Sequence, residues 1–451
     1  MQTVAPETKK QVAEWYTPGV PRKPLWRTAA EAIVCLIVAV AVLEGFFRLS
    51  GVGGQEFLTP SKTLGTTHLP GKKIIWRMEG FSADNLNAIG YRDVEHTIAK
   101  PAGVKRIAVL GDSHSEGLQV PLQDIYARRL ETQLNEKGNH NFEVINFACS
   151  GYSTAQEYVQ YTHEVEQYKP DVTVVLMHWG NTTANIVDPK RRNKAQPRPY
   201  FYLDEKGNLR QDNSVIDWYY APGSENSAWA KTINWLQLNS RIYGVLTQTD
   251  MALNNNEKVY FKWRGNFQRV LAFVQGKNPK AEVPGPAYAE QDPTKVTDAL
   301  VVALADKCTK SGSKLVVMLL PDPTGTASQQ LASELTALGK EHGFGLLDLS
   351  AAFKKHPQQK DLFLRVHLSS LGHKFVADTL QEYLIQNNLL ATNTVTVVSP
   401  RAPDSAAAKQ IAAKLPKEEA SAPSAQRAVS GAAPRESFPG YETLQEPWSV
   451  K

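Results

Sequence analysis

Residues 106–117 read RIAVLGDSHSEG, an apolar run that ends at a glycine and leads into Asp112, Ser113 and His114. A short continuous apolar run before a glycine is typical of a strand buried on both faces. A serine at the turn from such a strand into a helix has an exposed hydroxyl, and its own amide can point at a bound acyl oxygen. An ordinary helix N-cap would look the same, so this turn alone does not decide the function.

Downstream of this stretch, strand-like and helix-like runs alternate. The strand-like runs are 142–148, 171–179, 314–320 and 345–349, and the helix-like runs are 125–138, 154–168, 294–312, 327–342 and 371–387. Strands that alternate with helices imply a parallel sheet with helices on both sides. The sequence therefore predicts an α/β fold, a three-layer sandwich with a central parallel sheet.

The composition is that of a globular protein and argues against several functional classes. Hydrophobic residues make up 42% of the chain and charged residues 21%, which is ordinary for a folded core with a soluble surface. The net charge of +5 is small and spread along the chain, so we expect no nucleic-acid partner. The ten histidines are scattered without an HExxH-like pair, so we expect neither a metal nor another cofactor.

The three cysteines leave one conceivable disulfide. Cys35 falls in an apolar run near the N-terminus, so only Cys149 and Cys308 could pair with each other. The alternative is that both are free, because an unpaired cysteine often behaves as a small buried hydrophobic residue.

The N-terminal region predicts a membrane anchor. Residues 1–28 are polar and basic, and residues 29–48 are almost wholly apolar, with Glu31 and Glu44 near the two ends. About 20 helical residues cross a bilayer core. The basic residues precede the apolar run, so we expect a cytoplasmic N-terminus and an extracytoplasmic, periplasmic remainder. The alternatives are a buried core helix or a cleaved signal peptide, although no clear A-x-A-like site follows the run.

Three further segments complete the predicted domain organisation. Residues 49–104 are a connecting segment with glycine and proline punctuation. Residues 189–292 form a long aromatic insertion within the alternating region 105–390, and we expect it to hold a hairpin around DEKGN and several helices. Residues 391–451 are rich in alanine and proline with few bulky apolar side chains, which predicts a disordered tail.

Four loops with polar residues are expected at one edge of the sheet. In an open α/β sheet, ligands bind beyond the carboxyl ends of the strands. The loops there carry Ser113, Gly151 and Asn181, and His367 lies in the loop before the last helix. Gly151 lets the backbone approach a ligand, and the amide of Asn181 can serve an oxyanion. Each residue alone is consistent with an ordinary turn or a structural role, but this ordered set favours a catalytic site.

The same loops resemble the conserved blocks of the SGNH (GDSL-type) hydrolase family. VLGDSHSEG is similar to the first block, NFACSGYS to the second, WGNTTAN to the third and HLSSLGH to the fifth, and NAIGYRD fits the membrane-anchored members. The resemblance implies a flavodoxin-like SGNH hydrolase fold and a serine esterase with Ser113 as nucleophile and His367 as general base. It further implies that the amides of Ser113 and Gly151, with Asn181, hold the oxyanion of an acyl-transfer intermediate.

The chain departs from the family pattern at two positions. Leu364 stands three residues before His367, where the family has an aspartate, and Thr182 follows Asn181, where another aspartate is common. Asp361 is the possible orienting acid, but six extended residues span ~20 Å, and only a tight bend could bring it close to the imidazole. We therefore expect His367 to lack a carboxylate partner unless Asp361 reaches it.

The resemblance implies hydrolysis of acyl esters, chiefly O-acetyl groups, on a glycan of the cell envelope. The aromatic side chains of the insertion could stack on sugars, although packing in the core of the insertion is the favoured explanation for them. A polysaccharide O-acyltransferase would use the same residues, and only the acceptor, water or sugar, separates the two activities. A third alternative is a non-catalytic envelope protein on a degenerate SGNH scaffold, which Leu364 favours.

Overall fold

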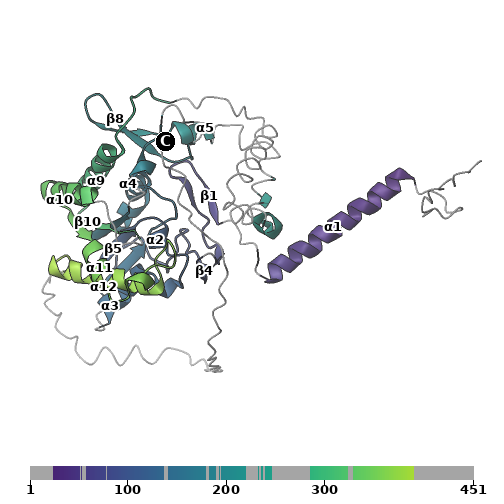
Figure 1. The fold of residues 1–451 in the computed structure, drawn as a ribbon, viewed down its shortest axis with the longest axis horizontal. Helices are drawn as coiled ribbons and strands as arrows, with labels where there is room; N and C mark the ends of the chain where they lie inside the picture. The colour runs from purple at the N-terminus through teal and green to yellow at the C-terminus, as the bar shows by residue number, and fades with distance from the viewer. Residues whose placement is uncertain are drawn as a thin grey trace, which may run out of the picture.

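The structure is a computed structural model. It describes residues 24–50, 52, 57–77, 79–136, 141–178, 182–188, 192, 195–219, 232, 235–236, 239–245, 285–322 and 329–390. Figure 1 shows a body of strands and helices, from which one long helix, α1 (Leu25–Ser50), stands apart. The predicted tail and most of the aromatic insertion lie outside the described residues, so those predictions stay open.

The body is built around one sheet of five parallel strands. In spatial order these are β11 (Gly345–Asp348), β10 (Lys314–Leu319), β7 (Val172–Met177), β5 (Lys105–Leu110) and β6 (Phe142–Asn146). The first of them in the chain, β5, lies between β6 and β7, so the strand order reverses beside it. Ligands of such sheets bind at the carboxyl ends of the strands around this switch point. The predicted parallel sheet is confirmed.

Helices cover both faces of this sheet, as Figure 1 shows. One face carries α3 (Tyr126–Asn135), α11 (Ser350–Lys355) and α12 (Ser370–Gln386), and the other carries α4 (Thr154–Gln160), α9 (Pro293–Lys310) and α10 (Gln329–His342). Within β5, Ile107 and Val109 pack into the first core, and Ala108 and Leu110 into the second. Successive side chains of a strand point to opposite faces, so one apolar run fills both cores and gives the predicted three-layer sandwich.

The segment before the sheet is more structured than a connector. Its strands form two antiparallel pairs, β1 (Leu58–Ser61) with β2 (Gly65–His68), and β3 (Lys73–Trp76) with β4 (Ser82–Asn85). We call residues 57–98 the upstream segment. The fully buried Arg92 donates hydrogen bonds to the carbonyls of Glu116 (3.0 Å) and Gly117 (2.6 Å), and its guanidinium pairs with Asp84. Because a buried charge needs such partners, Arg92 fixes the upstream segment against the turn that follows Ser113.

The described start of the aromatic insertion forms the predicted hairpin. β8 (Tyr200–Leu203) pairs with β9 (Leu209–Asp212), and α5 (Ser214–Tyr219) follows. Tyr200 and Phe201 are buried, and the Phe201 ring lies 5.7 Å from that of Tyr158 on α4. These two aromatic side chains therefore pack in the core, in line with the simpler of the two explanations.

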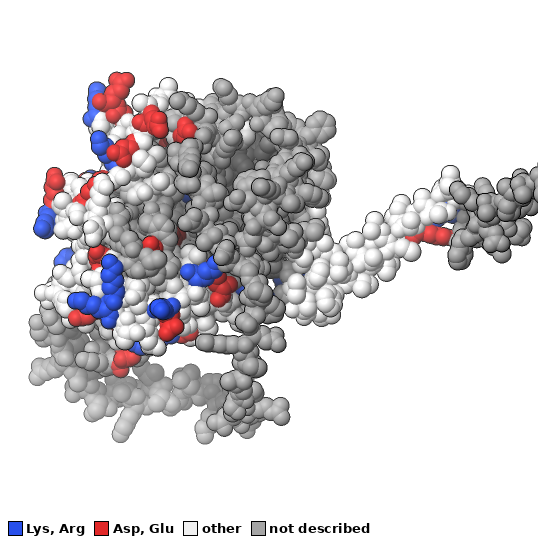
Figure 2. All heavy atoms as spheres, viewed as in Figure 1, with Lys and Arg blue, Asp and Glu red and all other residues white. Residues whose placement is uncertain are grey.

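The surface and the cysteines agree with a globular body. Figure 2 shows charges of both signs mixed over the described part of this face, whereas α1 is almost entirely uncharged. The most apolar 18-residue stretch of α1 has a mean hydropathy of 2.3, and none of it is buried, so α1 could cross a membrane or serve as a signal sequence. Cys149 and Cys308 are both buried and free, so the conceivable disulfide is absent between them.

Candidate active site

Ser113 lies where the sequence predicts, at the turn that follows β5. It is the first residue of a one-turn helix, α2 (Ser113–Glu116), which begins directly beyond the carboxyl end of the strand. The Asp112 carboxylate caps this turn by accepting a hydrogen bond from the His114 amide at 3.0 Å. An N-cap of this kind satisfies a donor that the helix itself cannot pair. The cap therefore holds the serine at a defined position on the edge of the sheet.

His367 comes from the opposite end of the fold and meets this serine. A tight turn closed by a hydrogen bond from the Leu364 amide to the His367 carbonyl (2.8 Å) presents the imidazole, and Ser369 caps α12 just after it. The His367 Nε2 atom lies 3.0 Å from Ser113 Oγ. This is hydrogen-bond distance, as a general base needs to accept a proton from the hydroxyl. The structure thus brings together the predicted pair across 254 residues.

The second ring nitrogen of His367 contacts a carboxylate that the sequence analysis did not consider. Glu79 Oε2 lies 3.1 Å from His367 Nδ1, and the same oxygen accepts hydrogen bonds from the amides of His367 (3.2 Å) and Val366 (3.4 Å). Since an ionised carboxylate can only accept, Nδ1 carries the proton and Nε2 is left to accept from Ser113. Ser113, His367 and Glu79 therefore form a hydrogen-bonded relay.

This contact corrects the expectation that His367 lacks a carboxylate partner. Asp361 lies in a short 3-10 turn (Gln359–Asp361), where its carbonyl accepts a hydrogen bond from the Ser369 hydroxyl. The carboxylate against the imidazole belongs to Glu79 instead. Leu364, at the position of the family's aspartate, is 43% exposed and leaves that role to the upstream segment.

The backbone at Glu79 is held in an unusual conformation that aims its side chain. Its φ of 61° is uncommon for a residue other than glycine and costs of order 1–3 kcal/mol. The next residue is Gly80, where an added Cβ would lie 2.1 Å from the Gln119 carbonyl oxygen. The Phe81 amide then donates to that same carbonyl at 3.1 Å. Close packing against the loop after α2 thus fixes the turn that carries Glu79.

The electrostatics keep Glu79 ionised. Burial raises the pKa of its carboxyl, but hydrogen bonds and charge from His367, with the amides of His367 and Val366, outweigh burial and lower the pKa to about 2. A depressed pKa means that these contacts stabilise the fold above the ordinary carboxyl range and lose that effect only as the pH falls towards 2. The carboxylate is therefore available as a fixed acceptor throughout the neutral range.

A second histidine–carboxylate pair lies behind the nucleophile. His178, at the end of β7, places Nε2 2.6 Å from Asp112 Oδ2. The buried ring of His114 packs against both His178 and His367, with its centroid 5.2 Å from each of theirs. Burial lowers the pKa of His114 to about 3, so this ring is neutral.

The same three residues, Asp112, His114 and His178, are close enough to be considered as metal ligands. Their candidate ligand atoms all lie within 4.8 Å of one another. Two ligand atoms on a tetrahedral zinc ion, with bonds of about 2.0–2.2 Å, stand roughly 3.3 Å apart, which is wider than the 2.6 Å between His178 and Asp112. In this structure the His178–Asp112 contact therefore has the length of a hydrogen bond.

Of the two residues predicted to complete the oxyanion site, one is described. Gly151 follows β6 in an exposed loop with a φ of 80°, a conformation that favours glycine. Its preceding residue, Ser150, donates its amide to Glu116 at 2.7 Å, which ties this loop to α2. Asn181 lies outside the described residues, just beyond His178.

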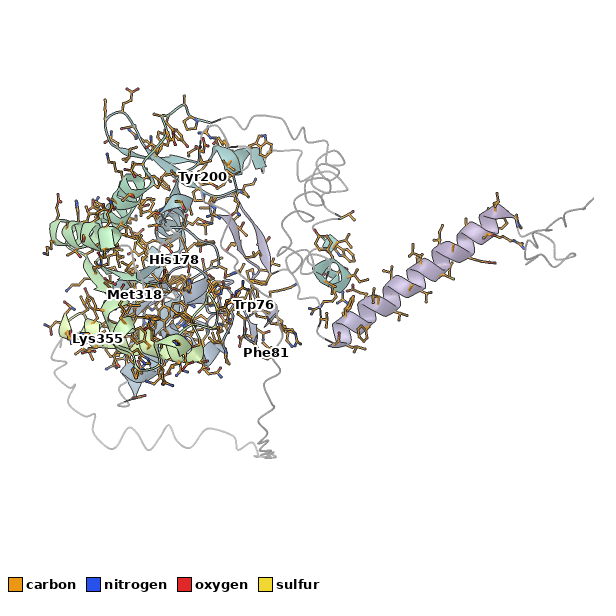
Figure 3. The ribbon with its side chains drawn as sticks, viewed as in Figure 1. Trp76, Phe81, His178, Tyr200, Met318 and Lys355 are labelled. Carbon is orange, nitrogen blue, oxygen red and sulfur yellow. The ribbon has the colours of Figure 1, made fainter. Side chains whose placement is uncertain are left out.

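Figure 3 labels His178 and two residues close to Glu79 in the sequence. Trp76 and Phe81, on either side of Glu79 in the sequence, lie at one edge of the body, and His178 lies nearer its middle. No motif marks Glu79 in the sequence. The only sequence signal for an orienting carboxylate elsewhere was indirect. With a leucine at position 364, any carboxylate partner of His367 had to come from another part of the chain.

Comparison with known proteins identifies the family of this chain. Residues 109–375, more than half of the chain, match the GDSL-like Lipase/Acylhydrolase family. No curated protein sequence matches the chain significantly. Similar solved structures include a lipase/acylhydrolase from Enterococcus faecalis, with 10% identity over 63% of this chain and 97% of that one and a TM-score of 0.33.

Two further solved structures are similar to the same extent. The acetyl xylan esterase AlAXEase is 15% identical, over 62% of this chain and 99% of that one, with a TM-score of 0.31. The psychrotrophic esterase EstA from Pseudoalteromonas sp. is 10% identical, over 63% of this chain and 98% of that one, with a TM-score of 0.31. On its family match, this chain belongs to the GDSL-like lipase/acylhydrolase family and is a carboxylic ester hydrolase.

Proposed function

We propose that this protein is a serine esterase that works through an acyl-enzyme on Ser113. The observation that supports the proposal best is the relay of two hydrogen bonds, 3.0 Å from Ser113 to His367 and 3.1 Å from His367 to Glu79. In the first step, His367 takes the hydroxyl proton as Ser113 Oγ attacks the acyl carbon. The protonated imidazole then gives that proton to the leaving alkoxide. Water, deprotonated by His367, hydrolyses the acyl-enzyme in the second half of the reaction.

Glu79 acts in this scheme through His367. Its carboxylate accepts from Nδ1–H, so it keeps the tautomer in which Nε2 faces the serine, and it stabilises the imidazolium that forms during attack. The third alternative from the sequence, a degenerate scaffold, relied on the absence of such a carboxylate. With Glu79 in place, that argument is removed.

The oxyanion would be held by the amides of Ser113 and Gly151 and by the side chain of Asn181. Ser113 stands at the start of α2, where the first amides have no partner within the helix. Donors arranged before the reaction are worth about 3–4 kcal/mol of barrier each, because they need no reorganisation as charge develops.

We propose O-acetyl esters of an extracytoplasmic glycan as the substrate. α1 supports the location, since it is long, apolar and exposed along its length, and the basic residues that precede it favour a cytoplasmic N-terminus. On this arrangement α1 is an uncleaved anchor, and the ester hydrolase body lies in the periplasm. Anchorage restricts the enzyme to substrates near the membrane surface, which is where envelope glycans are exported and modified.

Labelling by a fluorophosphonate tests the nucleophile. We expect the full-length protein in detergent micelles to be labelled at Ser113 and to release acetate from acetylated glycan oligomers. Ser113→Ala should abolish both, because only an activated serine attacks such phosphorus centres. Ser370→Ala is the matched control, since the Ser370 hydroxyl bonds to Asp124 and not to the relay. Labelling of Ser113→Ala at the wild-type rate would refute the assignment.

A further inference from the structure

A second buried carboxylate, that of Glu116, connects the nucleophile's helix to the oxyanion loop, which we define as residues 149–151. Glu116 is the last residue of α2 and is fully buried. Its Oε2 atom accepts a hydrogen bond from the Ser150 amide at 2.7 Å and another from the Ser150 hydroxyl. Two donors from one residue therefore converge on one oxygen, immediately before Gly151.

The other oxygen of this carboxylate faces a buried histidine from the upstream segment. Glu116 Oε1 lies 3.2 Å from Nε2 of His68, which ends β2 and is 2% exposed. His68 Nε2 is also 3.4 Å from the sulfur of Cys149, the first residue of the oxyanion loop. The histidine thus contacts both the carboxylate and the loop that the carboxylate holds.

The charge states agree with an ion pair. Burial alone would lower the pKa of His68, but Glu116 raises it well above its usual value. Burial alone would raise the pKa of Glu116, but His68 and Ser150 lower it. Since breaking one half of a buried ion pair leaves an uncompensated charge, Glu116 and His68 hold each other in place.

We infer that the Glu116–His68 pair is a positioning device that sets the distance between the amides of Ser113 and Gly151. Ser113 and Glu116 are the two ends of one helical turn, so the carboxylate moves with the nucleophile. The Ser150 amide binds that carboxylate, so the Gly151 amide is fixed relative to the serine. The inference rests on the proposed function, because it assigns Glu116 to the oxyanion site of that same reaction.

The test is Glu116→Gln in the full-length protein, assayed with an acyl ester. Glutamine has nearly the same shape as glutamate. It lacks the negative charge that holds His68, and it has one acceptor oxygen in place of two. Removing an oxyanion donor costs ~10²–10³-fold in kcat, and a displaced donor should cost roughly 10–100-fold, with KM changed less than about threefold. Affinity for a trifluoromethyl ketone, which forms a tetrahedral oxyanion on the serine, should fall in parallel with kcat.

The matched control is Glu157→Gln on α4. Glu157 is also fully buried, and burial raises the pKa of its carboxyl well above the usual value, but neither of its oxygens has a hydrogen-bond partner among the described residues. We expect its kcat to stay within about twofold of wild type. A merely structural role for Glu116 would instead reduce the fraction of protein labelled by fluorophosphonate and leave the turnover per labelled site unchanged.

Two outcomes would overturn the inference. One is wild-type turnover per site in Glu116→Gln, and the other is a fall in kcat with no loss of ketone affinity. Should Glu116→Gln fail to fold, Ser150→Ala is the second variant, because it removes one of the two donors to Glu116. It should lower kcat roughly 3–10-fold, and unchanged turnover in Ser150→Ala would also overturn the inference. Activity that survives Ser113→Ala would contradict the proposed function itself, so the two failures are distinguishable.

Discussion

The sheet region, residues 105–390, and the upstream segment, residues 57–98, contribute to the site in different ways. The sheet region supplies Ser113 and His367 at the ends of regular elements, where general rules for α/β folds place ligand-binding residues. The upstream segment supplies Glu79 and His68 from short hairpins, and both lie outside the part of the chain that matches the family. The reacting pair thus belongs to the family scaffold, and the groups that orient it come from an addition to that scaffold.

This difference shows how a residue that the family pattern expects can be replaced by one from a segment outside the family-matched part of the chain. Leu364 stands at the position of the family's aspartate and carries no charge. Glu79, 288 residues away from His367 in the chain, contacts the imidazole instead. Arg92 makes this possible because it fastens the upstream segment to the carbonyls of Glu116 and Gly117. Both oriented contacts, at His367 and at the oxyanion loop, depend on that docking.

The largest effect should follow from Glu79→Gln. A glutamine can donate to Nδ1 and so favours the wrong tautomer of His367, and loss of a triad carboxylate can cost ~10⁴-fold in kcat. We expect a fall of about 10³–10⁴-fold in turnover, with the thermal unfolding midpoint little changed.

Glu95→Gln is the matched control in the same segment. The Glu95 carboxylate accepts a hydrogen bond from the Ala88 amide and not from a residue of the relay. Its turnover should equal that of wild type. A loss of less than tenfold in Glu79→Gln would mean that Glu79 does not orient His367.

The smallest effects should come from the positions that the family pattern points to. We expect Asp361→Asn and Leu364→Asp each to change kcat less than about threefold, because Glu79 already occupies Nδ1 of His367. Steady-state kinetics on an acyl ester would measure both. A tenfold loss of kcat in Asp361→Asn would mean that Asp361, in the sheet region, orients His367, and not the upstream segment.

The sequence predicted the fold and the reacting pair because both depend on local patterns. The apolar run at 106–110 and the alternation of strand-like and helix-like runs after it indicate a parallel sheet, and the carboxyl end of that strand then places Ser113. His367 was predicted because it lies in the loop before the last helix and because HLSSLGH resembles a block of the family. In the structure, His367 Nε2 lies 3.0 Å from Ser113 Oγ.

Glu79 could not be predicted in the same way. Its place depends on the unusual backbone at residue 79 and on close packing of Gly80 against the Gln119 carbonyl, and no periodic pattern encodes either feature. The Glu116–His68 pair was missed for a related reason, since a buried glutamate in a surface-like sequence, SHSEG, gives no sign of burial. The roles of such residues can be recognised only in the folded structure, where segments distant in the sequence are in contact.

The most direct test of the account is the Nδ1–H resonance of His367 in the full-length protein labelled with ¹⁵N-histidine. A proton held between Nδ1 and a carboxylate is shifted downfield and protected from exchange, and its assignment would follow from its loss in His367→Gln. We predict that this resonance is present in wild type and in Asp361→Asn and that Glu79→Gln removes it or moves it upfield. An unchanged resonance in Glu79→Gln, together with its loss in Asp361→Asn, would contradict the central claim that the upstream segment orients the catalytic histidine.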